Sequence, residues 1–158
     1  MIFIFAHPPQ LPSIKGLLTE CDLYAEDLDA AKVNHLLLCR TEGQLAGVVG
    51  MEVFGETGLL RSLAVAPAFR ERGIGSLLLV RIERFAALQG ARSFYLATEK
   101  AADFFAARGY THLPTAEVPE SVRAAPLFTE LAARGASAMV KPLAARKVPA
   151  ARRAAGPM

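Results

Sequence analysis

The sequence predicts one α/β domain, in which helices flank a mixed central sheet of about six or seven strands. Its 158 residues are enough for one compact domain and too few for two ordinary ones. Between residues 35 and 65, short turn sequences separate three apolar runs, which is typical of antiparallel strands. After residue 67 the apolar spacing becomes helical and then extended again, which predicts a helix that connects two parallel strands.

A short strand and two helices are expected before the antiparallel strands. Residues 2–5 are all Ile or Phe, as in a β-strand. Residues 13–21 place apolar side chains on one helical face, and residues 26–33 carry a weaker helical pattern. The three strands that follow are expected at residues 35–39, 45–54 and 59–65.

The second half of the chain begins with the connecting helix, which Gly90 is suited to end. Its predicted apolar face consists of Ile74, Leu78, Ile82, Phe85 and Leu88. Residues 93–97 form the next strand, and Thr98 can cap a helix that runs to about residue 108. The last predicted elements are a helical region at residues 119–134 and a strand at residues 136–140.

The formal net charge of +3 comes entirely from the C-terminal segment. Residues 143–158 carry four basic residues and no acidic residue, so the remainder of the chain carries −1. The segment has no apolar stripe and no aromatic residue to stack on bases. We therefore expect a domain at residues 1–142 followed by a basic, disordered tail, and no nucleic-acid partner.

Nothing in the sequence predicts export, membrane insertion or a metal site. Cys21 and Cys39 have no companions at a spacing typical of zinc ligands, so we interpret them as free thiols. The apolar N-terminus lacks the basic start and the cleavage site of a signal peptide, and no apolar run reaches the roughly 20 residues that span a bilayer. A cytoplasmic protein without a metal or membrane partner is expected.

The most informative segment is a basic turn between the third of these strands and the connecting helix. Arg70 and Arg72 precede Gly73 and Gly75 at the start of that helix. Unpaired N–H groups at a helix start attract anions, and glycines let the backbone approach closely. The spacing fits neither a Walker loop nor GxGxxG. A pyrophosphate is a suitable ligand for this turn.

The pattern Arg70-x-x-Gly73-x-Gly75 after a strand resembles the acetyl-CoA signature [QR]xxGx[GA] of the GNAT acetyltransferases. The resemblance implies that the preceding strand offers its backbone to the pantetheine arm and that amides of the turn hold the pyrophosphate. The expected cofactor-binding residues are Leu63, Ala64, Val65, Arg70, Glu71, Arg72, Gly73, Ile74, Gly75, Ser76, Thr98 and Phe105.

The resemblance extends over residues 14–142. Residues 101–110 look like a later helix of the family, and residues 50–52 with 58–65 are similar to GNAT proteins encoded in bacterial arsenic-resistance operons. At two positions the chain departs from the family. Phe105 replaces a tyrosine that protonates the departing thiolate in many relatives, and Thr98 replaces an asparagine. A thiol, with a pKa of about 8.5, can also leave as thiolate.

Two charged residues in the central strands are the candidates for chemistry. Acetyl transfer needs a neutral amine, and Glu52 is the candidate base, the alternative being a charge on an edge strand. Arg61 interrupts an apolar strand and could bind the carboxylate or oxyanion of a substrate. An ion pair with a residue such as Glu52 is an equal alternative for Arg61.

The predicted function is direct transfer of acetyl from acetyl-CoA to the amino group of a small molecule, without a metal. The family likeness suggests an amino acid or an arsenic-containing analogue as acceptor. Two alternatives are a non-catalytic acyl-CoA-binding sensor, which Phe105 favours, and a protein N-acetyltransferase, whose basic tail would recruit acidic partners. A homodimer is compatible with the sequence.

Overall fold

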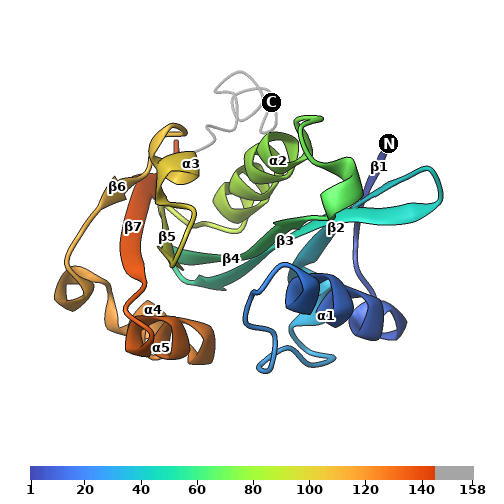
Figure 1. Ribbon diagram of the computed structural model, residues 1–158. Helices are drawn as coiled ribbons and strands as arrows, with labels where there is room; N and C mark the ends of the chain where they lie inside the picture. Colours follow the sequence, from blue (N-terminus) through green and yellow to red (C-terminus); the bar gives the residue numbers. More distant parts are fainter. Residues whose placement is uncertain (145–158) are drawn as a thin grey trace, which may run out of the picture.

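The structure is a computed structural model that describes residues 1–144, and almost all of the predicted basic tail lies outside these residues. A seven-stranded mixed sheet runs through the domain in the order β1-β2-β3-β4-β5-β7-β6 (Figure 1). The predicted α/β fold with a mixed sheet is confirmed. The strands are β1 Ile2–Phe5, β2 Leu36–Thr41, β3 Gln44–Phe54, β4 Thr57–Val65, β5 Ser93–Thr98, β6 Thr111–His112 and β7 Ser137–Pro142.

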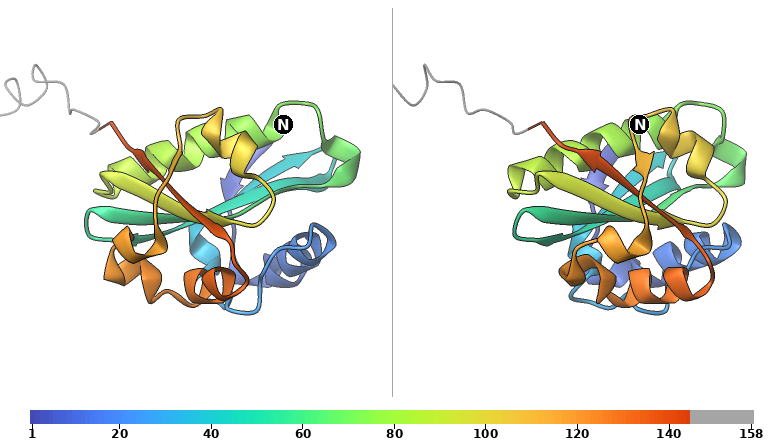
Figure 2. Two further views of the ribbon diagram at one scale, coloured as in Figure 1. Left: turned by 60° about the vertical axis from the view of Figure 1, so that its left-hand side comes forward. Right: turned by 90° about the vertical axis from the view of Figure 1, so that its left-hand side faces the viewer.

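Helices cover both faces of the sheet. The α-helices are α1 Leu11–Glu20, α2 Ile74–Leu88, α3 Ala102–Ala106, α4 Glu120–Arg123 and α5 Pro126–Ala133. Short 3-10 turns are η1 Pro8–Gln10, η2 Val33–His35, η3 Pro67–Phe69 and η4 Thr115–Glu117. One face carries α2 and α3, and the opposite face carries α1, α4 and α5 (Figures 1 and 2).

The pairing of the strands matches the sequence prediction. Strands β1 to β4 form an antiparallel meander in chain order. Strand β5 then pairs in parallel with β4 after the crossover through α2. Buried residues of α2, including Ile74, Leu78 and Ile82, form the core on one face of the sheet. Separate apolar clusters lie beneath α1 and beneath α4 and α5.

Strands β4 and β5 pair over a short stretch and then diverge. Thr57–Leu59 lie opposite Ser93–Tyr95, although both strands continue beyond these residues. Just past this point the β3–β4 pairing is irregular, so that Ser62 and Leu63 together face Val49. Such a bulge bends a strand and redirects its side chains. The divergence opens the sheet at its centre.

Several sequence predictions of helices were wrong. Residues 26–33 form turns instead of a helix, because the carboxylate of Asp29 accepts hydrogen bonds from the amides of Ala31 and Lys32. The expected helix from Thr98 starts only at Ala102, since Thr98 ends β5 and accepts a hydrogen bond from the Ala101 amide.

Other differences are smaller. The helical region at residues 119–134 divides into α4 and α5, with Pro126 at the first position of α5. Leu88, which was assigned to the buried face of α2, is 57% exposed. The two-residue strand β6 was not predicted.

Candidate active site

A cleft of about 280 Å³ lies where β4 and β5 diverge. Its walls come from these two strands, from the segment after α1, and from residues of α3 and α5. Four of the predicted site residues on β4 line it, namely Arg61 and Leu63 to Val65, together with Arg70 from the following turn. Thr98 and Phe105 line it from the opposite wall.

The first turn of α2 has the geometry of an anion cradle. Gly73 caps the helix in the left-handed conformation, with φ of +79°, and Glu71 also has a positive φ of +64°. A Cβ added at Gly73 would meet no atom within 4 Å, so the space there is open, and one added at Gly75 would make ordinary contacts at 3.7 Å with Val65 and Phe104. The amides of this turn are therefore approachable by a phosphate group.

The two arginines of the turn point to different places. Arg70 Nε donates to the carbonyl oxygen of Val65 at 3.0 Å, so its side chain folds back into the cleft. Arg72 pairs with Glu42 at 2.8 Å on the exposed surface and covers the ring of Phe69. Arg70 is thus the arginine that adds positive charge to the cleft.

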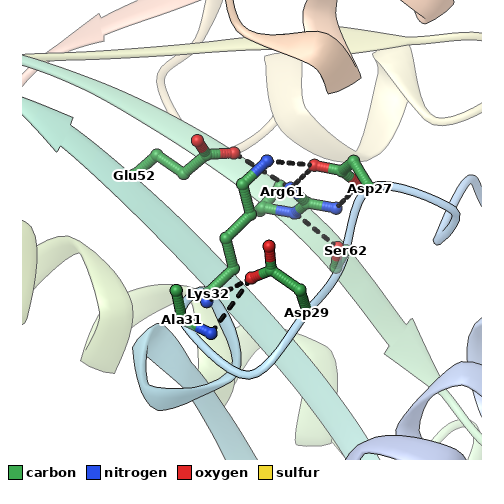
Figure 3. Close-up of polar contacts among 7 residues, drawn as sticks. All are labelled: Asp27, Asp29, Ala31, Lys32, Glu52, Arg61 and Ser62. Atoms are coloured by element: carbon green, nitrogen blue, oxygen red, sulfur yellow. Dashed lines mark hydrogen bonds and ion pairs between the residues drawn. The ribbon is translucent and has the colours of Figure 1, made fainter.

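Arg61 lies at the centre of a buried charge cluster on the α1 side of the sheet (Figure 3). Its two Nη atoms donate to the carboxylate of Asp27 at 2.5 and 2.6 Å, and Nη1 also donates to Glu52 at 2.9 Å. Its Nε donates to the Ser62 hydroxyl oxygen at 3.0 Å. Lys32 Nζ donates at 2.9 Å to Asp27 Oδ2, the oxygen that also accepts from Arg61 Nη1. The cluster holds two cations and two carboxylates.

The cluster keeps Asp27 and Arg61 ionised. Burial raises the pKa of Asp27, but hydrogen bonds and charges from Arg61 and Lys32 outweigh burial and bring that pKa below its usual value. Burial likewise lowers the pKa of Arg61, while Asp27 and Glu52 raise it by more. Arg61 therefore stays a cation although it is only 2% exposed.

Glu52, the candidate base, forms an ion pair with Arg61. Its side chain is 14% exposed, and it is not among the described residues that line the cleft. Arg61 does line the cleft, and its donors are engaged by Asp27, Glu52 and Ser62. Of the two interpretations of Arg61, the ion pair with Glu52 is formed in the structure.

Two buried aromatic residues bear on the question of a proton donor. They are Phe105, which stands where many relatives carry a tyrosine, and the nearby Tyr110. Phe105 packs edge-to-face on Phe104 and Tyr110 and is 5% exposed. Burial and the neighbouring Glu83 raise the pKa of Tyr110, whose hydroxyl donates to Glu83 at 2.8 Å. Tyr110 is therefore a core residue, and neither aromatic offers a proton to the cleft.

Sequence reasoning missed three residues of this region. Asp27 lies in a segment that was expected to be helical, and it pairs with Arg61 across 34 positions, a separation for which the sequence carries no signal. Ser62 follows Arg61 on β4 and was not among the predicted site residues. Arg108 stacks on the Phe104 ring and donates to Ser76 in the first turns of α2.

Comparison with known families places the fold. Residues 32–112 match the model of the Acetyltransferase (GNAT) domain family. The chain belongs to this family. Within the described residues, no helix is long and apolar enough to cross a membrane, and no group of His, Cys, Asp and Glu side chains could hold a metal ion.

Solved GNAT structures share the fold at low sequence identity. N-acetylglutamate synthase from Neisseria gonorrhoeae, complexed with coenzyme A and N-acetyl-glutamate, superposes with a TM-score of 0.79 at 23% identity, over 90% of this chain and 35% of that one. This chain thus spans about a third of the synthase. Rv2747 from Mycobacterium tuberculosis, in complex with CoA, gives 0.74 at 22% identity, over 91% and 100%. An aminoglycoside 6'-N-acetyltransferase complexed with coenzyme A gives 0.67 at 18%, over 93% and 99%.

Proposed function

We propose that the protein transfers acetyl from acetyl-CoA directly to the amino group of a small molecule. The observation that carries the proposal is the junction of two features of one GNAT fold. The open first turn of α2, with Gly73 and Gly75, follows β4 along the chain, and Gly75 lies beside Val65, one of the residues that line the cleft between β4 and β5. A diphosphate and a long acyl-bearing arm fit these two features in sequence.

The residues present suit acetyl-CoA. The amides of Glu71 to Ser76 would hold the pyrophosphate, with Arg70 beside them and Leu63 to Val65 along the arm. When bound, acetyl-CoA supplies an activated thioester. The chain contributes binding, orientation and the removal of water from the reacting groups.

Glu52 remains the proposed base. One of its carboxylate oxygens accepts from Arg61, and an acceptor ammonium would lose its proton to this carboxylate directly or through a water molecule. Arg61 would orient the Glu52 carboxylate through this hydrogen bond. Because the two cations and two carboxylates of the cluster balance, an arriving ammonium group would meet no net positive charge there.

The acceptor would be a small amine, with an amino acid or an arsenic-containing analogue as the first class to test. A carboxylate on the acceptor would use Arg61, which lines the cleft and has one Nη2 hydrogen beyond the contacts described above. The N-acetylglutamate synthase and aminoglycoside acetyltransferase structures, with their different named substrates, support testing both amino acids and larger amines.

Thiol release from acetyl-CoA in the presence of a panel of amines tests the proposed function. Turnover on at least one small amine is expected. Binding of acetyl-CoA without turnover on any amine would favour a non-catalytic sensor, the alternative that Phe105 supports. Turnover on peptides alone would favour a protein acetyltransferase.

Replacing Gly73 tests the cradle. Gly73→Val places a branched side chain at φ of +79° in the turn proposed to hold the pyrophosphate, so the stabilisation by CoA should disappear. In the parent protein, CoA at 100 times its Kd should add about 2.7 kcal/mol to the free energy of unfolding. Thermal-shift titration with CoA measures both.

Gly135→Val is the matched control for Gly73→Val. Gly135 has φ of +81°, no atom near its virtual Cβ, and no place in the cleft. The Gly135→Val variant should be destabilised about as much as Gly73→Val, and CoA should raise its melting temperature as much as it does in the parent protein. Normal CoA binding by Gly73→Val would show that the cradle is assigned to the wrong turn.

A further inference from the structure

The bulge in β4 carries a serine in a conformation that serine rarely adopts. Ser62 has φ of +61°, in the left-handed region that favours glycine. It lies three residues beyond Leu59, where the pairing of β4 with β5 ends, and it lines the cleft. Strained residues persist where surrounding contacts hold them, and they cluster at functional sites.

A buried cation holds the side chain of Ser62. Arg61 Nε–H donates to the Ser62 hydroxyl oxygen at 3.0 Å, while Asp27 and Glu52 fix the rest of the guanidinium. Because the oxygen accepts this bond, the hydroxyl hydrogen is left for another acceptor. Among residues 1–144, Arg61 is the one hydrogen-bond partner of this hydroxyl. A hydrogen bond from a cation also polarises the hydroxyl and makes it a stronger donor.

Acyl transfer in the cleft would be accelerated by such a hydrogen-bond donor. Attack of an amine on a thioester places negative charge on the carbonyl oxygen, and fixed donors aimed at that oxygen lower the barrier. Phe105 on the opposite wall offers no donor, and the Tyr110 hydroxyl is bound to Glu83. Ser62 is held in place by contacts that exist before any substrate binds, which is the preorganisation this role requires.

We propose that the Ser62 hydroxyl donates a hydrogen bond to the acyl carbonyl oxygen of bound acetyl-CoA and to the charge that develops there. Ser62 forms no covalent bond and gives up no proton. Arg61 acts through Ser62 and is a positioning residue. This inference rests on the proposed function, which supplies the acyl group and the cleft it occupies.

Infrared difference spectra of acetyl-CoA labelled with ¹³C at the thioester carbonyl test the contact itself. A hydrogen bond weakens the C=O bond, so the labelled band should move to lower frequency in the parent protein. In Ser62→Ala and Ser62→Gly, which lack the hydroxyl donor, the labelled carbonyl band should lie at a higher frequency than in the parent protein. An identical band in all three proteins would overturn the proposal.

The two substitutions separate the hydroxyl from the backbone. Ser62→Ala keeps a side chain in the left-handed conformation, whereas Ser62→Gly relieves it, and both lack the hydroxyl. Both should lower kcat by about 10²–10³-fold, with a small change in the KM for acetyl-CoA and an unchanged shape of the pH profile. Parent-like turnover by Ser62→Gly would assign the effect to the backbone and overturn the role of the hydroxyl.

The outcomes also distinguish this inference from the proposed function. If the parent protein binds acetyl-CoA but acetylates no amine, the proposed function fails, and the infrared band still decides whether Ser62 contacts the carbonyl. If the parent protein does not bind acetyl-CoA, both proposals fall. If the parent protein turns over and both variants match it, only the Ser62 proposal is wrong.

Discussion

Asp27 is the residue on which the buried charges of this protein depend. Its carboxylate is 4% exposed and bridges Arg61 and Lys32, so it ties the segment after α1 to the central strand β4. A buried cation that loses its counter-ion keeps the cost of leaving water without the compensating attraction. Asp27→Asn should therefore lower the free energy of unfolding by about 3–5 kcal/mol, measured by urea denaturation at pH 7. An effect below about 1 kcal/mol would contradict this account.

The lowered pKa of Asp27 also predicts that the folded protein loses stability at acidic pH. The pKa of Asp27 is lower in the folded protein than in the unfolded chain, where it is about 3.9. Its stabilisation is thus fully present above the unfolded pKa and is lost as pH falls through the folded pKa. Between pH 5 and pH 2.5 the melting temperature of the parent protein should fall more steeply than that of Asp27→Asn. Parallel profiles would count against the pairing.

At the scale of elements, Arg108 links α3 to the first turn of α2, which is the turn proposed to bind the cofactor. Arg108 lies 3.7 Å above the Phe104 ring, donates to the Phe104 carbonyl at 2.8 Å, and reaches Ser76 in α2 at 2.8 Å. Arg108→Ala should cost about 1–2 kcal/mol of stability and reduce the thermal shift caused by CoA. Arg81→Ala is the control, because Arg81 stacks on Phe3 of β1, away from the cleft, and should leave that shift intact.

The elements also show what sequence patterns can and cannot predict. The strands of the meander were placed to within about two residues, because each apolar run is bounded by turn residues. The turn proposed as an anion cradle was predicted from its two glycines together with the arginines, the preceding strand and the following helix, and the structure does place it at the start of α2. The segment at residues 26–33 was misassigned because the Asp29 side chain competes for backbone amides, which periodicity does not register. The positive φ of Ser62 has no sequence signal, since it arises from the bulge between two strands.

For the whole molecule, the separation of charge between domain and tail gives a test of acceptor class. The last described residues remain attached to the domain, since the Leu143 amide donates to the Arg92 carbonyl at 2.8 Å. A chain truncated after Ala144 keeps this bond and loses all four basic residues of the tail. Its melting temperature and its turnover on small amines should match the parent values. Loss of turnover on small amines would show that the tail takes part in catalysis.

The short pairing of β4 with β5 has a consequence for the order in which the protein folds during synthesis. The meander β1 to β4 lies within residues 1–65, with α1 between β1 and β2 and short turns between the later strands, whereas β5 follows the crossover helix α2. On a ribosome the first wall of the cleft would therefore exist well before the second. In a nascent chain halted after β4, the backbone edge of β4 that later pairs with β5 would be unpaired, and we expect chaperones that bind exposed strand edges to act on such a chain.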